Sequence, residues 1–121
     1  NLLCMSASYS PNLENEFPAD IPIDIQSGKI DWDVFNSWTQ NDPVEMIDRE
    51  DYQEALKSLD YCFIDVGRSD EYNLQFGARL FVDKLKAFEV PHVYEEFDGG
   101  HRGTAFRYDV SIPAMVTALV G

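Results

Sequence analysis

Residues 61–72 have the sequence YCFIDVGRSDEY, in which an apolar run gives way to a polar turn. The aromatic and branched residues at 61–64 are typical of a strand that is buried on both faces. Gly67 is expected to end this strand. In open α/β sheets, catalytic and binding groups lie just beyond the carboxyl ends of the strands. Asp70 therefore occupies a position where a sheet would present a functional carboxylate.

A second strand and turn of the same kind follow later in the chain. Residues 93–97, VYEEF, predict a short strand near a sheet edge, because charged residues interrupt its apolar pattern. The turn DGGH at 98–101 then brings His101 to the same end of the sheet. An acid and a histidine placed in this way could be two members of a catalytic triad, in which the third is a nucleophile.

The rest of the chain predicts helices and one further strand. Residues 74–88 have the strongest helical pattern, with apolar or small residues at spacings of three and four: Leu74, Gly77, Ala78, Phe81, Leu85 and Phe88. Asp42 and Pro43 predict a helix start, followed by a helix or pair of turns to about Leu59. We expect a short helix over Pro113–Val120 and a buried strand over Leu2–Met5. This order predicts an α/β fold with a parallel sheet of about three strands and flanking helices.

Residues 12–42 form an irregular stretch, expected to be a long loop or cap-like insertion. Within it, residues 31–38 predict two helical turns, with Asp31 as the N-cap and Trp32, Phe35 and Trp38 on one side. These aromatic residues could form a small satellite core under the loop. Alternatively, they could form the hydrophobic wall of a substrate pocket, because loops of this length are usually functional or disordered.

Composition sets further bounds. At 121 residues, with 45% hydrophobic content, the chain is expected to build one core in one partial domain. A net charge of -13 argues against binding to nucleic acid or an anionic membrane surface, and no apolar run is long enough to span a membrane. Cys4 and Cys62 are expected to be buried thiols, which favours a reducing, cytoplasmic location. We predict no cofactor and no metal site.

Several of these segments together resemble the C-terminal half of an α/β-hydrolase. They are the run FIDVG at 63–67 with DEY at 70–72, the helix at 74–88, and VPHVY at 90–94 with FDGGH at 97–101. The similarity is to the esterase family that includes esterase D-like, feruloyl esterase-like and enterochelin esterase-like enzymes. The sequence ASYSP at 7–11 also resembles the loop that follows the sixth strand in that family.

The resemblance implies that Asp70 is the triad acid, that His101 is the general base and that the substrate is a small-molecule ester. The family's nucleophilic serine lies in a Gly-x-Ser-x-Gly elbow, and none of the eight serines here has that context. We therefore expect the chain to be a partial domain that needs a missing N-terminal half and is inactive alone. The open edge of the Leu2–Met5 strand is expected to favour self-association.

Other interpretations stay open for individual residues and for the whole chain. Asp70 could be a turn-former or N-cap, and His101 a surface loop residue. Asp65 is interpreted as a structural acid, and Glu71 is expected to face solvent. A left-handed conformation at Glu89, where the family often has glycine, would be mildly strained. The chain could also belong to a non-catalytic hydrolase-like binding module or be a small α/β interaction domain.

Overall fold

The computed structural model describes residues 2–121, and the chain divides into two compact units, residues 1–46 and 47–121. That residues 1–121 make up a single partial domain stays a prediction.

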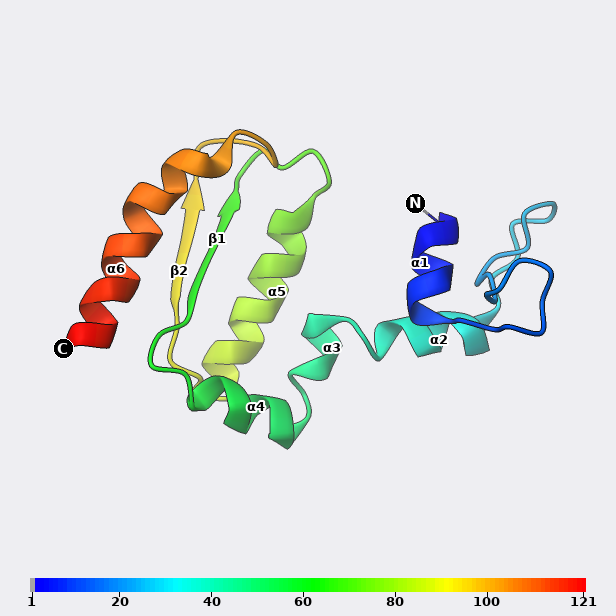
Figure 1. The fold of residues 1–121 in the computed structure, drawn as a ribbon, viewed down its shortest axis with the longest axis horizontal. Helices are drawn as coiled ribbons and strands as arrows, with labels where there is room; N and C mark the ends of the chain where they lie inside the picture. Colours follow the sequence, from blue (N-terminus) through cyan, green and yellow to red (C-terminus); the bar gives the residue numbers. More distant parts are fainter. Residues whose placement is uncertain (1) are drawn as a thin grey trace. The chain divides into compact units, whose positions relative to one another are not determined.

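The second unit is built around two parallel strands, a mixed α/β arrangement. Its elements are α4 (Glu50–Lys57), β1 (Phe63–Gly67), α5 (Leu74–Ala87), β2 (Val93–Phe97), the short 3₁₀ helix η1 (Thr104–Arg107) and α6 (Tyr108–Val120). Phe63 pairs with Val93 and Gly67 with Phe97, so the two strands end together. Parallel strands need a crossover connection, and α5 provides it. Figure 1 shows the strands between α5 and α6.

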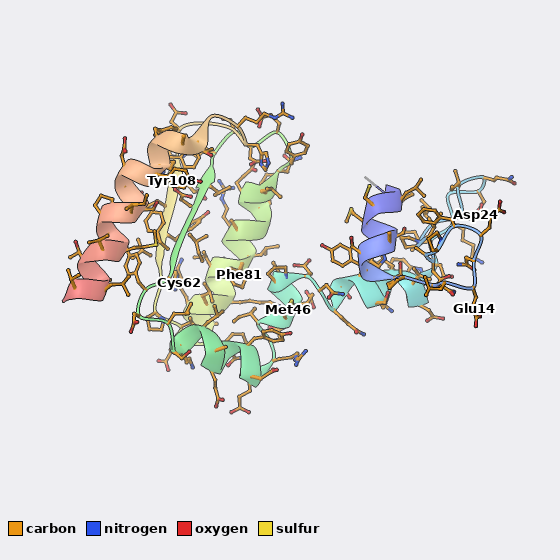
Figure 2. The ribbon with its side chains drawn as sticks, in the orientation of Figure 1. Glu14, Asp24, Met46, Cys62, Phe81 and Tyr108 are labelled. Atoms are coloured by element: carbon orange, nitrogen blue, oxygen red, sulfur yellow. The ribbon has the colours of Figure 1, made fainter. Side chains whose placement is uncertain are left out.

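The buried core of this unit lies between α4, α5 and the first strand. Ile47, Leu85 and Val90 form its centre, and partly buried apolar residues pack against them: Leu56, Ile64, Phe81 and Phe88. Figure 2 shows Phe81 on α5. Leu85, Phe81 and Phe88 belong to the apolar repeat that predicted this helix, so the repeat marks the face that α5 buries.

The opposite side of the sheet carries charge. Asp65 and Glu95 are directly paired across the strands. Arg107 of η1 donates to both, with 2.8 Å from its Nε to Asp65 Oδ2. Asp65 is therefore a structural acid, as its place inside the strand predicted. Residues of β1 and α6 line an open pocket of about 500 Å³ on this side, to which Cys62 and Tyr108 contribute (Figure 2).

The first unit contains three helices joined by irregular chain. They are α1 (Leu2–Tyr9), α2 (Trp32–Thr39) and α3 (Pro43–Met46). Asp31 is the N-cap of α2, as predicted, and its carboxylate accepts from the N–H groups of Asp33 at 3.1 Å and Val34 at 3.2 Å. Residues 42–59 form helices rather than one continuous element, since α3 and α4 are separated by a break.

Four sequence predictions are corrected. Cys4 is exposed and Cys62 only partly buried, so neither is the buried thiol that was expected. Leu2–Met5 is helical and not a strand, so residues 2–121 hold two strands instead of about three. A short apolar run without periodicity fits either element, and leucine and methionine are good helix formers. The first strand begins at Phe63 and is only partly buried. The last helix begins at Tyr108, with Pro113 inside it.

These corrections remove the strand edge from which self-association was expected, while self-association itself stays a prediction. No helix within residues 2–121 has the length and apolarity needed to cross a membrane.

Candidate functional site

The ends of the two strands continue into loops that are bonded to each other. We call residues 68–73, after β1, the acid loop, and residues 98–103, after β2, the histidine loop. The N–H of Arg68 donates to the carbonyl of Phe97 at 2.9 Å, and the N–H of Ser69 donates to the carbonyl of Gly99 at 3.0 Å. The main-chain pairing of the sheet therefore extends past its last residues and holds the two loops side by side.

Gly67 makes this close approach possible. A Cβ atom at this position would stand 2.4 Å from the carbonyl oxygen of Gly99 and 2.6 Å from that of Gly100. Real Cβ atoms do not come so near to a main-chain oxygen, and these backbones cannot simply rotate away. Glycine is thus required at position 67 because the histidine loop leaves no space for a side chain there.

Asp70 binds the ring of His101. The distance from Asp70 Oδ2 to His101 Nδ1 is 3.0 Å, so the hydrogen bond expected between the two residues is present. The second oxygen, Oδ1, accepts from the N–H of Tyr72 at 2.8 Å and approaches the N–H of Leu74 at 3.5 Å. Asp70 therefore also shapes its own turn, with one oxygen bound to the His101 ring and the other to main-chain N–H groups of the turn.

Burial and hydrogen bonding act in opposite directions on Asp70, which is 5% exposed. Burial raises the pKa of the carboxyl, but the N–H of Tyr72 and the contact with His101 outweigh it and hold the pKa below its usual range. The residue is thus ionised at neutral pH, as the partner of an imidazole must be to stabilise its cation.

His101 is held on one side and open on the other. Its side chain is 42% exposed, and the ring of Tyr72 meets it edge-on, with 4.8 Å between ring centroids. Because Asp70 engages Nδ1, Nε2 is the nitrogen left to accept a proton from another group. Within residues 2–121 this ring is hydrogen-bonded to a carboxylate, so the described site pairs an imidazole with a carboxylate.

Glu71 is exposed, as the sequence predicted, but its carboxylate also binds the histidine loop. Its Oε2 accepts the main-chain N–H of His101 at 2.8 Å. This hydrogen bond holds the pKa of the Glu71 carboxyl below its usual range. The adjacent acids Asp70 and Glu71 thus bind the ring and the main chain of the same histidine. The sequence shows that Asp70 and Glu71 are adjacent acids, which could have suggested that both lie near His101. Which side chain binds the ring and which binds the main chain depends on the geometry of the turn.

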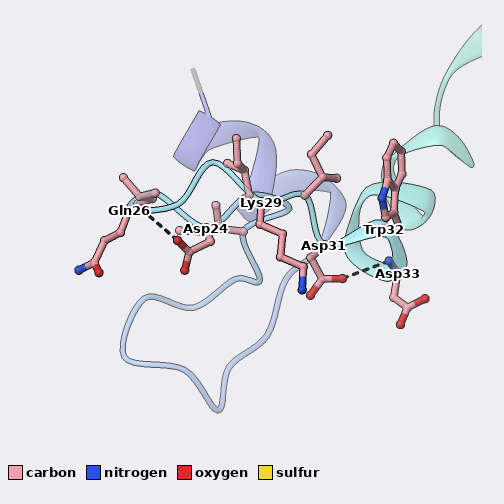
Figure 3. A pocket seen from close by; sticks show the side chains of 10 residues that line it. Asp24, Gln26, Lys29, Asp31, Trp32 and Asp33 are labelled. Carbon is pink, nitrogen blue, oxygen red and sulfur yellow. Dashed lines mark hydrogen bonds between the residues drawn. The ribbon is translucent and has the colours of Figure 1, made fainter.

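The three aromatic residues suggested for substrate binding lie in the first unit and divide between two pockets. Phe35 and Trp38 line a mainly apolar pocket of about 310 Å³ together with Met5 and Tyr9. The indole N–H of Trp38 donates to Ser10 Oγ at 2.8 Å. Trp32 contacts Phe35 edge-on but lines a different pocket, of about 750 Å³ (Figure 3).

The pocket in Figure 3 mixes isoleucines with charged residues. Asp24, Asp31 and Asp33 line it beside Lys29. The carboxylates of Asp24 and Asp31 accept from nearby main-chain N–H groups, so they shape the loop and the start of α2. The part of the chain that the structure describes contains no group of three or more histidine, cysteine or acidic residues arranged to hold a metal ion.

Comparison with known proteins gives a similarity in structure but none in sequence. No family model matches the sequence, and no curated protein matches it. Among solved structures, the chain is similar to a ferulic acid esterase, with a TM-score of 0.47 and 24% sequence identity. The alignment covers 84% of this chain and 36% of the esterase, so the chain spans little more than a third of that protein's length.

Proposed function

We propose that the chain provides the acid and the base of a serine carboxylesterase, with the nucleophilic serine outside residues 2–121. The observation that carries this proposal is the 3.0 Å contact between a buried, ionised Asp70 and Nδ1 of His101. Both residues follow the carboxyl ends of neighbouring parallel strands, where functional groups gather in α/β sheets.

The proposed chemistry assigns one task to each residue. A serine hydroxyl is a poor nucleophile at neutral pH, so Nε2 of His101 would take its proton as the oxygen attacks an ester carbonyl. Asp70 would keep the proton of the ring on Nδ1 and stabilise the imidazolium that forms. His101 would then return the proton to the leaving alcohol. The exposed side of the ring leaves room for serine and substrate.

The acyl group of the substrate is a separate part of the proposal. Trp32, Phe35 and Trp38 of the first unit would favour an aromatic or sugar-linked ester, and two of them, Phe35 and Trp38, line an apolar pocket there. The competing interpretation is the satellite core, which the hydrogen bond from Trp38 to Ser10 favours for this one indole.

The test compares the 121-residue chain with a longer protein that also contains the segment preceding Asn1. On an activated ester such as p-nitrophenyl acetate, the chain alone should show no turnover above a His101→Ala control. This control is needed because free imidazole hydrolyses such esters slowly. The longer protein should be active, and its activity should vanish on replacing the elbow serine and in His101→Ala. Saturable turnover by the isolated chain that depended on Ser69 would contradict the proposal.

A non-catalytic binding module that keeps the acid and the histidine but lacks the serine is the second candidate. The residue at the elbow position distinguishes the two: serine within Gly-x-Ser-x-Gly favours the enzyme. The 3.0 Å contact gives no support to a third possibility, an interaction domain in which Asp70 and His101 are together by chance.

A further inference from the structure

Two groups on the acid loop bind His101 at two different points. Asp70 binds the ring nitrogen Nδ1, while Glu71 accepts the main-chain N–H at 2.8 Å. A hydrogen bond to the ring alone leaves the Cα atom free to shift with its loop. A second bond to the main-chain nitrogen fixes the point from which the side chain starts, so both together define where Nε2 lies.

The absence of a side chain at Gly100 leaves space for the Glu71 carboxylate. A Cβ atom at position 100 would stand 2.9 Å from each carboxylate oxygen of Glu71 and 3.0 Å from its Cδ. The carboxylate therefore lies directly against the main chain of the histidine loop. Because it is the end of a flexible side chain, an added methyl group would push the carboxylate away without any need for the main chain to move.

We propose that Glu71 is a positioning residue for His101, acting through the main-chain N–H of the histidine and through the space left by Gly100. As a role in catalysis, this rests on the proposed function, since only the esterase needs Nε2 at a defined place. As a statement about where the ring lies, it can be tested in the 121-residue chain itself.

The experiment uses NMR on this chain, with two readouts at His101: hydrogen exchange of the main-chain amide and the resonance of the ring proton on Nδ1. The variants are Glu71→Ala, which removes the acceptor, and Gly100→Ala, which displaces it. Glu71→Gln keeps an acceptor oxygen without the charge, and Asp98→Ala changes an exposed acid of the same loop as the control.

We expect Glu71→Ala and Gly100→Ala each to speed exchange of the His101 amide by about 10- to 100-fold, since a hydrogen bond to a charged group is lost. The Nδ1 proton signal should broaden or disappear in both. The double variant should be no worse than either single one, because both remove the same contact. Glu71→Gln should lie between Glu71→Ala and the unchanged protein, and Asp98→Ala should have no effect.

Unchanged exchange and an unchanged ring-proton signal in Glu71→Ala would overturn the proposal, and so would an equal effect of Asp98→Ala. These readouts do not depend on hydrolysis, so they keep their meaning even if the longer protein proves inactive. Conversely, if the longer protein is active and Glu71→Ala leaves its kcat unchanged, the esterase proposal is retained and the role of Glu71 in catalysis is rejected.

Discussion

Gly67 at the end of β1 lies so close to Gly99 in the histidine loop that a methyl group at position 67 would stand 2.4 Å from the Gly99 carbonyl oxygen. We expect Gly67→Ala to separate the two loops or to distort the strand end. Forced overpacking of this kind costs about 1–3 kcal/mol. Urea denaturation followed by circular dichroism would measure the loss.

Gly77→Ala is the matched control. Gly77 lies inside α5, and a Cβ there would meet nothing within 4 Å. Alanine is favoured over glycine in a helix interior by about 0.5–1 kcal/mol, so this variant should be more stable than the parent. Similar effects of the two substitutions would contradict the packing explanation.

If the longer protein proves to be an esterase, Asp70→Asn in that protein tests the role of the carboxylate. Asparagine is close in shape but cannot hold the ring in the same tautomer or stabilise its cation. Activity should fall on the order of 10⁴-fold. Wild-type activity would mean that Asp70 only shapes its turn. Glu71 would then be the acid to test, since Asp65 is occupied by Arg107.

Glu96 on β2 should make the second unit sensitive to acid. Arg79 of α5 donates to both its oxygens, at 2.6 and 2.8 Å, and Tyr94 donates at 2.8 Å. The pairing with Arg79, followed by the hydrogen bond from Tyr94, lowers the pKa of Glu96 from 4.5 to about 2. The folded state favours the charged form of Glu96. The stability that this carboxylate contributes is therefore complete above pH 4.5 and is lost as the pH falls toward 2.

The urea midpoint at pH 5 and at pH 3 measures this dependence. Glu96→Gln should be less stable than the parent at pH 5 and should lose less on acidification. Asp83→Asn is the control, since Asp83 forms only an exposed pair with Lys86 at 3.6 Å. An equal acid slope in the parent and in Glu96→Gln would show that other carboxylates control the response.

Glu89→Gly should stabilise the end of α5. Glu89 has φ of 55°, the left-handed conformation expected from the sequence. The N–H of Val90 donates to the carbonyl of Leu85, and the N–H of Glu89 donates to the carbonyl of Lys86. This is the pattern of a Schellman cap. Glycine removes the strain of a side chain there but adds disorder to the unfolded chain, so the net gain should be about 0.5–1 kcal/mol. Thermal unfolding would measure it, and Glu89→Ala should give no gain.

Some elements could be predicted because their residues repeat with one period. The apolar repeat of α5 appears where the sequence predicted it. The strand at Val93–Phe97 also appears where it was predicted, although charged residues interrupt its apolar pattern. Leu2–Met5 has no period, so composition alone could not separate helix from strand. The last helix was expected to begin at Pro113, because proline favours the first turn of a helix. It begins five residues earlier, at Tyr108, and tolerates the loss of the one hydrogen bond that proline removes.

The contact between Asp70 and His101 could be predicted because parallel strands end at one edge of a sheet. The contact of Glu71 could not, since it depends on which way a side chain leaves a turn. Gly67 was predicted as the end of a strand, whereas its need for space comes from a loop far along the chain. Arg107 likewise binds Asp65 from an element whose position no local pattern gives.

The bonding of the acid loop to the histidine loop has a consequence for how this region comes apart. The main-chain N–H of Arg68 binds the end of β2, and the N–H of Ser69 and the side chain of Glu71 bind the histidine loop. Such groups open and close together as one cooperative unit. We therefore expect mild heat or denaturant to give a mixture of molecules with the acid and the histidine fully assembled and molecules with both dispersed. A population in which the pair is merely misaligned should be scarce, and the amides of Ser69 and His101 should report a single opening event.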